Sequence, residues 1–75
     1  MQKINLKEIY DNANKHYSNK DYEKAKDLYL SILKHAPQHP ETNNNLGLTY
    51  RNLNQIKDAI NCFKTALKSN ENYVI

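Results

Sequence analysis

The chain has 75 residues, of which 39% are hydrophobic and 25% are charged, and it contains one glycine and two prolines. This length suits one small domain with a thin core, and the composition excludes collagen-like and low-complexity chains. The net charge is +3, but acidic residues lie between the lysines, as in KDYEKAKD at residues 20–27, so the basic charge does not form a nucleic-acid-binding arm.

Two absences in the sequence indicate the compartment. Cys62 is the only cysteine, so no disulfide can form within the chain. The N-terminal stretch MQKINLKEIY has no apolar core of signal-peptide length, and no apolar run approaches the roughly 18 residues of a membrane span. We therefore expect a cytoplasmic protein without membrane association, unless the chain was cut from a longer protein that carries its own targeting signal.

The first half of the chain predicts two helices, at residues 4–18 and 22–35. The first has an apolar stripe at helical spacing, formed by Leu6, Ile9, Ala13 and Tyr17. The second has a longer stripe, formed by Ala25, Leu28, Tyr29, Ile32, Leu33 and Ala36. Asp21 is the expected N-cap of the second helix, and Pro37 ends it because proline lacks an amide hydrogen.

The second half predicts helices at residues 41–53 and 56–69. The sequence His39-Pro40-Glu41 suits a helix start, with proline at the first helical position and an acid in the first turn. Asn54 is the expected N-cap of the last helix. The apolar stripes are Leu46, Tyr50 and Leu53, and then Ile56, Ala59, Ile60, Phe63, Ala66 and Leu67. Short links make neighbouring helices antiparallel.

The two halves resemble each other at an offset of 34 residues. This shift pairs small residues with small and aromatic residues mostly with aromatic: Ala25 with Ala59, Tyr29 with Phe63, Leu33 with Leu67, and Ala13 with Gly47. A common offset across both halves indicates two copies of one helical hairpin.

A 34-residue helix-turn-helix unit with small and aromatic landmarks resembles the tetratricopeptide repeat (TPR). The second copy carries NLGLTY at residues 45–50, followed by Ala59, Phe63 and Ala66, and the first copy carries Ala13, Tyr22, Ala25, Tyr29 and Pro37. We predict an all-α fold of two stacked antiparallel helix-turn-helix repeats, a TPR-like α-solenoid with four helices and a short C-terminal tail. The single domain, residues 1–75, would contain repeat one at about 6–39 and repeat two at about 40–73.

Several landmarks depart from the family pattern. The large aromatic expected early in the first helix is Ile9 in one copy and Asn43 in the other. The turn glycine is replaced by Lys20 and by Asn54, and Glu71 occupies the place of the closing proline in the second copy. These changes leave the 34-residue period intact.

The sequence offers little for catalysis. A single glycine excludes a glycine-rich phosphate loop, and Pro37 separates His35 from His39, so the two imidazoles do not share a helix face as metal ligands. We expect Cys62 to be a packing residue and His16 to be a partly buried structural histidine. We therefore predict a protein that is not an enzyme and has no cofactor or metal site.

The resemblance implies that the first helix of each repeat lines a concave groove. The groove-facing side chains would be Lys7, Tyr10, Asn14, Tyr17 and Ser18 in the first copy, and Glu41, Asn44, Asn45, Leu48, Arg51 and Asn52 in the second. Asparagine amides can bond a peptide backbone, and tyrosine rings can pack on its apolar side chains. We therefore predict a protein–protein interaction scaffold that binds a peptide segment or partner protein through Lys7, Tyr10, Asn14, Tyr17, Asn44, Asn45, Leu48, Arg51 and Asn52.

Asn14 and Asn45 also match the two asparagines of a carboxylate clamp that some family members use for a C-terminal peptide. Tyr10 replaces the first clamp lysine, and the third repeat that supplies the other basic groups is absent. Lys7 lies about one turn away and is a candidate substitute. Since asparagine is abundant in this chain, a chance match is the alternative.

The C-terminal end raises a separate expectation. Apolar residues of the last helix lack a predicted cover, and more apolar residues follow: Ile60, Phe63 and Leu67, then Tyr73, Val74 and Ile75. Arrays of this type need three or more repeats or a polar cap. We predict either a longer parent array or a homo-oligomer formed through this end, the alternative being a frayed tail on a marginally stable monomer.

Two further functions compete with peptide binding. The chain could be a regulatory or substrate-guiding segment of a larger enzyme, such as a glycosyltransferase preceded by repeats. Nucleic-acid binding through lysine would give a steep salt dependence, and the interspersed acids argue against it.

Overall fold

A computed structural model describes residues 4–69 of the chain. The described part contains four helices and no strand: α1 (Leu6–Ser18), α2 (Tyr22–His35), α3 (Pro40–Asn52) and α4 (Ile56–Ser69). The predicted all-α fold is confirmed, and the predicted helix bounds differ by at most two residues. The largest difference is at the start of α1, because the Asn5 side chain caps that helix by accepting a hydrogen bond from the Glu8 amide at 3.1 Å.

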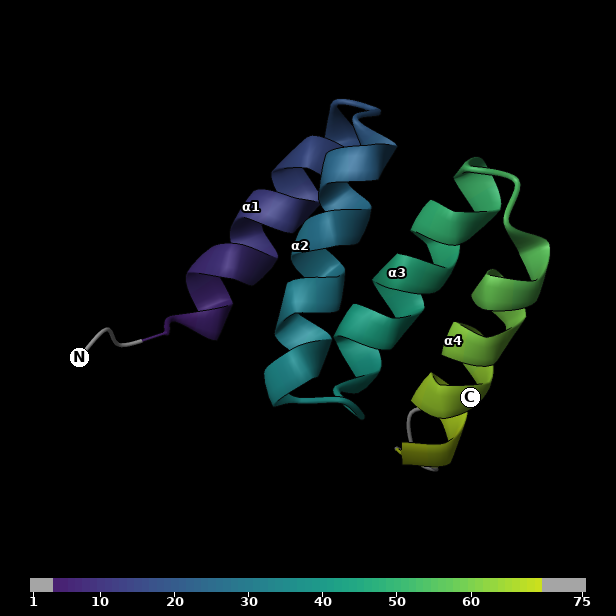
Figure 1. Cartoon of the computed structure of the whole chain (residues 1–75). Coiled ribbons are helices and arrows are strands. Elements are labelled where there is room, and N and C mark those ends of the chain that lie inside the picture. The colour runs from purple at the N-terminus through teal and green to yellow at the C-terminus, as the bar shows by residue number, and fades with distance from the viewer. Residues whose placement is uncertain (1–3, 70–75) are drawn as a thin grey trace.

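The helices form two antiparallel hairpins that stack side by side (Figure 1). α1 packs on α2, α2 on α3, and α3 on α4. Leu6 and Pro40, the first residues of α1 and α3, are 34 positions apart, and the same interval separates Tyr22 and Ile56, which begin α2 and α4. The 34-residue echo in the sequence is therefore a structural repeat.

The turn inside each hairpin has the same backbone conformation. Lys20 and Asn54 both have a positive φ of 64°. The next residue in each turn donates its amide hydrogen five residues back, from Asp21 to the His16 carbonyl and from Gln55 to the Tyr50 carbonyl, both at 2.8 Å. This closure is typical of a helix that ends at a left-handed residue, which explains why the family pattern has glycine at this place.

The two predicted N-caps inside the hairpins have different outcomes. Asp21 is the N-cap of α2, although its side chain makes no capping hydrogen bond and lies 3.3 Å from the His16 ring. The prediction for Asn54 is wrong, since this residue belongs to the left-handed turn and α4 begins at Ile56. The first amide bond of α4 instead goes from Ala59 to the Gln55 carbonyl at 3.1 Å.

The link between the hairpins is organised by two side chains. His39 caps α3, its Nδ1 accepting from the Thr42 amide at 3.3 Å, and Pro40 occupies the first turn as predicted. Asn43 is only 3% exposed, and its Nδ2 donates to the carbonyls of Pro37 and His39, both at 3.1 Å. The departure from the family's aromatic residue at position 43 therefore has a structural role, because the amide satisfies two carbonyls of the link.

The core lies where the four helices meet and combines small with large side chains. Ala13 and Ala25 are fully buried and allow α1 and α2 to approach closely, while Tyr29 and Leu46 are 1% exposed and supply bulk. Most of the predicted stripe residues belong to this cluster or pack against it, including Leu6, Ile9, Tyr17, Leu28, Ile32, Leu33 and Tyr50.

Candidate functional site

Hydrogen bonds between α1 and α3 connect several of the predicted groove residues. Asn45 Nδ2 donates to the Tyr10 hydroxyl at 2.9 Å, and Asn52 Nδ2 donates to the Tyr17 hydroxyl at 3.1 Å. The two pairs lie seven residues apart on each helix, which is about two helical turns. We call them the two Tyr–Asn pairs. They align α1 and α3 side by side and place a row of phenol and amide groups between the two helices.

A buried network lies beneath the first Tyr–Asn pair. Asn14 Oδ1 accepts from the Tyr29 hydroxyl and from Asn45 Nδ2, the latter at 3.2 Å. Burial, and then the neighbouring Tyr10, raise the pKa of Tyr29 to about 12, so its hydroxyl remains a donor at neutral pH. Asn14 and Asn45 therefore join three helices, and part of their hydrogen-bonding capacity is used within the fold.

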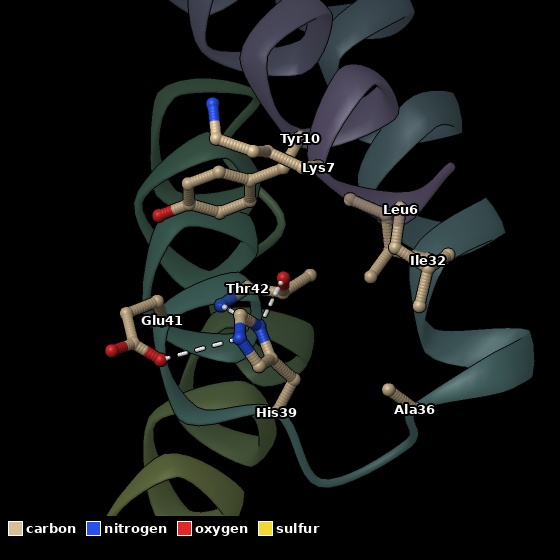
Figure 2. A pocket seen from close by; sticks show the side chains of 8 residues that line it. All are labelled: Leu6, Lys7, Tyr10, Ile32, Ala36, His39, Glu41 and Thr42. Carbon is tan, nitrogen blue, oxygen red and sulfur yellow. Dashed lines mark hydrogen bonds and ion pairs between the residues drawn. The ribbon is translucent and has the colours of Figure 1, made fainter.

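A cavity of about 390 Å³ lies at one end of the two helices (Figure 2). It is formed by the N-terminal turns of α1 and α3 and by the C-terminal end of α2. Figure 2 shows an apolar wall, made by Leu6, Ile32 and Ala36, facing a wall that carries polar groups. The residues of the polar wall and rim are Lys7, Tyr10, His39, Glu41 and Thr42. Such a cavity can accept an apolar side chain while its rim bonds to polar groups beside it.

His39 has an orientation that its neighbours determine. Its Nδ1 lies 2.7 Å from the Thr42 hydroxyl and also accepts from the Thr42 amide. Its Nε2 lies 3.4 Å from a carboxylate oxygen of Glu41 (Figure 2). Because Nδ1 accepts, we assign the ring proton of the neutral form to Nε2, which then donates toward Glu41. The Tyr10 ring meets the imidazole edge-on, with centroids 6.0 Å apart.

A smaller cavity of about 80 Å³ lies between the two Tyr–Asn pairs. Its lining combines amide, phenol and one aliphatic group: Asn14, Tyr17, Tyr29, Asn45 and Leu48. Tyr17 is held by an edge-on contact with Tyr22, with ring centroids 5.4 Å apart. The surface along α1 and α3 therefore has a large apolar cavity at one end and a small, more polar one near its middle.

The structure places the predicted contact residues in three groups. Lys7 and Tyr10 line the large cavity, and Asn14, Tyr17, Asn45 and Leu48 line the small one. Asn52 reaches this surface through Tyr17. Asn44 and Arg51 lie on α3, and neither makes a side-chain hydrogen bond or ion pair with any residue in the range 4–69. Their amide and guanidinium groups are therefore open to a ligand.

Sequence reasoning missed most of the large cavity. Leu6, Ile32 and Ala36 were assigned to helix stripes, and His39 was assigned to an exposed linker. The cavity arises because the link after α2 brings three helix ends together, and no single stripe contains that information. The expectation of a partly buried His16 agrees with its 35% exposed side chain.

The groups that could support catalysis have other roles. Burial, and then Asp58, raise the pKa of the Cys62 thiol to about 11, so the sulfur is protonated and weakly nucleophilic at neutral pH. In the described range, no three side chains of His, Cys, Asp or Glu gather closely enough to bind a metal ion. Cys62 instead belongs to the core cluster, as predicted.

Comparisons with known proteins give one family assignment. Residues 40–73 match the family model described as Tetratricopeptide repeat. This segment begins at the first residue of α3 and includes α4, and α1 and α2 repeat the same hairpin 34 residues earlier. The comparison with curated proteins gives no match. None of the helices between residues 4 and 69 has both the length and the hydropathy needed to cross a membrane.

Proposed function

Because the chain belongs to the tetratricopeptide repeat family, whose repeats generally mediate protein–protein interaction, we propose that it is a non-catalytic module that binds an extended peptide of a partner protein along α1 and α3. The observation that carries this proposal is the continuous surface formed by the large cavity, the two Tyr–Asn pairs and the exposed Arg51.

The arrangement suggests how such a peptide would lie. An apolar side chain of the peptide enters the large cavity against Leu6 and Ile32, where burial of carbon surface favours binding. Its backbone runs along α3, where the Asn44 amide can both donate and accept. A carboxylate farther along the peptide pairs with Arg51, whose planar guanidinium suits a two-point contact.

The carboxylate-clamp variant of this proposal requires a rearrangement. Asn14 and Asn45 are bonded to each other and to tyrosines, and Lys7 is paired with Asp11 at 3.0 Å. A terminal carboxylate at the two asparagines would have to displace some of these bonds. The Lys7–Asp11 pair is highly exposed and contributes little to stability, so it opens readily.

The contact residues differ in their value as tests. Asn45→Ala removes bonds to Tyr10 and Asn14, so it would perturb the fold together with any ligand contact. Ala36→Leu fills the large cavity without removing a hydrogen bond, and Arg51→Ala removes an exposed side chain that has no ion pair within residues 4–69. Leu30→Ser is a suitable control because Leu30 is an exposed residue of α2 that lines neither cavity.

The experiment is a selection of peptides from a random display library on the full chain, followed by titration of the selected peptides. We expect Ala36→Leu and Arg51→Ala each to weaken binding about tenfold, a loss of one good contact, while Leu30→Ser leaves it unchanged. Circular dichroism establishes that the variants remain helical. Peptides whose affinity is the same for all four proteins would refute the groove as the binding surface. A cytoplasmic location is part of the same proposal and is checked by imaging a fluorescent fusion.

A further inference from the structure

The outward face of α4 carries an apolar stripe separate from the groove. Ile56, Ile60 and Leu67 are 47%, 45% and 48% exposed. At 100° per residue these side chains point in nearly the same direction, over about three helical turns. Isolated exposed aliphatic residues are normal on a protein surface, but three on one helix face indicate a contact site.

The repeat register indicates that this face is shaped to receive a helix. The counterparts of Phe63 and Leu67, 34 residues earlier, are Tyr29 and Leu33 on α2, the helix that packs on α3. Tyr29 belongs to the core cluster and Leu33 packs against it. In α4, Phe63 is half-buried against Gly47 of α3, whereas Leu67 is half-exposed. α4 therefore continues a helix-to-helix interface established inside the molecule, and Figure 1 shows α4 at the outer end of the row of helices.

A row of positive charge lies along the free edge of the stripe. Lys57, Lys64 and Lys68 are exposed and make no ion pair with any residue in the range 4–69. The opposite edge, including Ala59 and Ala66, is buried toward α3. A ligand on the stripe would therefore meet three ammonium groups on one side.

From the stripe, the repeat register and the lysine row, we propose that the outward face of α4 binds an amphipathic helix of a partner protein that has an apolar stripe and an acidic flank. The apolar residues of the partner helix pack on Ile56, Ile60 and Leu67. Its acidic flank lies over the lysine row, where opposite charge sets the orientation of the helix and excludes basic competitors.

The same charges argue against a second copy of the chain as the occupant. If two α4 helices paired antiparallel about a two-fold axis with their stripes in contact, the two lysine rows would lie on the same side of the pair and repel each other. A head-to-tail contact with α1 also fits poorly. The α3 residues Leu46, Thr49 and Leu53 have Asn12, Lys15 and Asn19 as their counterparts on α1, and all three are exposed polar residues.

The test uses two synthetic peptides titrated into the isotope-labelled full chain and followed by NMR. Both peptides have the same leucine stripe and a length of about 20 residues, long enough to form a helix. One carries glutamates on its flank and the other carries lysines. We expect the glutamate peptide to shift the amide signals of Ile56, Ile60 and Leu67 and to bind about tenfold more tightly than the lysine peptide, as three surface ion pairs allow.

Three variants of the chain sharpen the result. Ile60→Gln should weaken the glutamate peptide about tenfold, since it removes the central apolar contact. The double variant Lys64→Glu/Lys68→Glu should reverse the preference between the two peptides, whereas Leu30→Ser on α2 should change nothing. Because these residues lie outside the groove, a failure here leaves the groove proposal untouched.

Two outcomes would overturn this inference. One is equal binding of the two peptides, or shifts confined to Tyr10 and Tyr17 on α1. The other is a concentration-dependent dimer in analytical ultracentrifugation that Ile60→Gln converts to a monomer, which would assign the face to a second copy, as the sequence led us to consider. The apolar residues Tyr73, Val74 and Ile75 lie outside the described residues and play no part in the inference.

Discussion

Gly47 of α3 lies directly against the ring of Phe63 of α4. A Cβ atom placed on Gly47 would be 2.6 Å from Cε1 of the ring and within 3 Å of two other ring carbons. The only glycine of the chain is therefore needed for close packing, because its backbone angle φ is negative and imposes no demand for glycine. The first hairpin has Ala13 in the equivalent place, opposite Tyr29, so the two hairpins accommodate their aromatic rings differently.

Gly47→Ala should lower the free energy of unfolding by about 1 kcal/mol. Displacement of the Phe63 ring costs roughly 1–3 kcal/mol as overpacking, and replacement of a helical glycine by alanine returns about 1 kcal/mol. Urea unfolding of the two proteins measures the difference. In a Phe63→Leu background the same substitution should become neutral or stabilising, because the ring is gone. An increase in stability with Phe63 intact would show that the ring moves without cost.

Lys20→Gly should raise the free energy of unfolding by about 0.5–1 kcal/mol. An L-residue in the left-handed conformation costs roughly 1–2 kcal/mol, part of which is offset by the greater chain entropy of unfolded glycine. Asn54→Gly should give a smaller gain, since asparagine tolerates this conformation better than lysine. Asn19→Gly is the matched control, because Asn19 has a φ of −84°. A gain of equal size at Asn19 would mean that the backbone angle is not the cause.

Asn43→Ala should cost about 1–3 kcal/mol of stability, the range for buried groups that lose a hydrogen-bond partner. The substitution leaves the carbonyls of Pro37 and His39 without the amide that bonds them. Asn44→Ala, one residue later, should cost less than about 0.5 kcal/mol, since that side chain is only partly buried. Chemical unfolding of both variants tests the contrast, and similar losses would contradict the role assigned to Asn43.

Stability should decline in alkaline solution as Tyr29 and Cys62 ionise. Burial is the main cause of both raised pKa values, about 12 for Tyr29 and about 11 for Cys62, against ordinary values of 10.0 and 9.0. The folded state therefore retains these protons more strongly than the unfolded state. The contribution is fully present below about pH 9, and it is lost as the pH rises through 11 and 12.

Tyr29→Phe isolates the tyrosine part of this effect. The variant should be less stable at neutral pH, because it loses the hydrogen bond to Asn14, but its stability should fall less steeply above pH 10. Unfolding curves at several pH values between 7 and 11.5 give the two slopes. Equal slopes for both proteins would assign the alkaline decline to other groups. The rate of Cys62 alkylation in the folded protein should likewise stay low up to about pH 10.

The candidate site was predictable only in part. The residues of α1 and α3 were named from the family resemblance, and the structure brings Tyr10, Asn14, Tyr17 and Asn45 together. Their bonding to one another was not predictable, because an isolated helix stripe does not show which polar groups of two helices face each other. The cavity wall at Ile32 and Ala36 was missed for the same reason.

By itself the sequence determined the four helices, their antiparallel order and the 34-residue repeat. Each of these follows from contacts close in the chain: apolar residues at helical spacing, a proline that ends a helix, and links too short for any other connection. Only the tertiary structure decided that Asn54 forms a left-handed turn, that Asn14 and Asn45 bond with tyrosines, and that three helix ends enclose a cavity. These features depend on the positions of groups from different helices, and packing sets those positions only after the helices have formed.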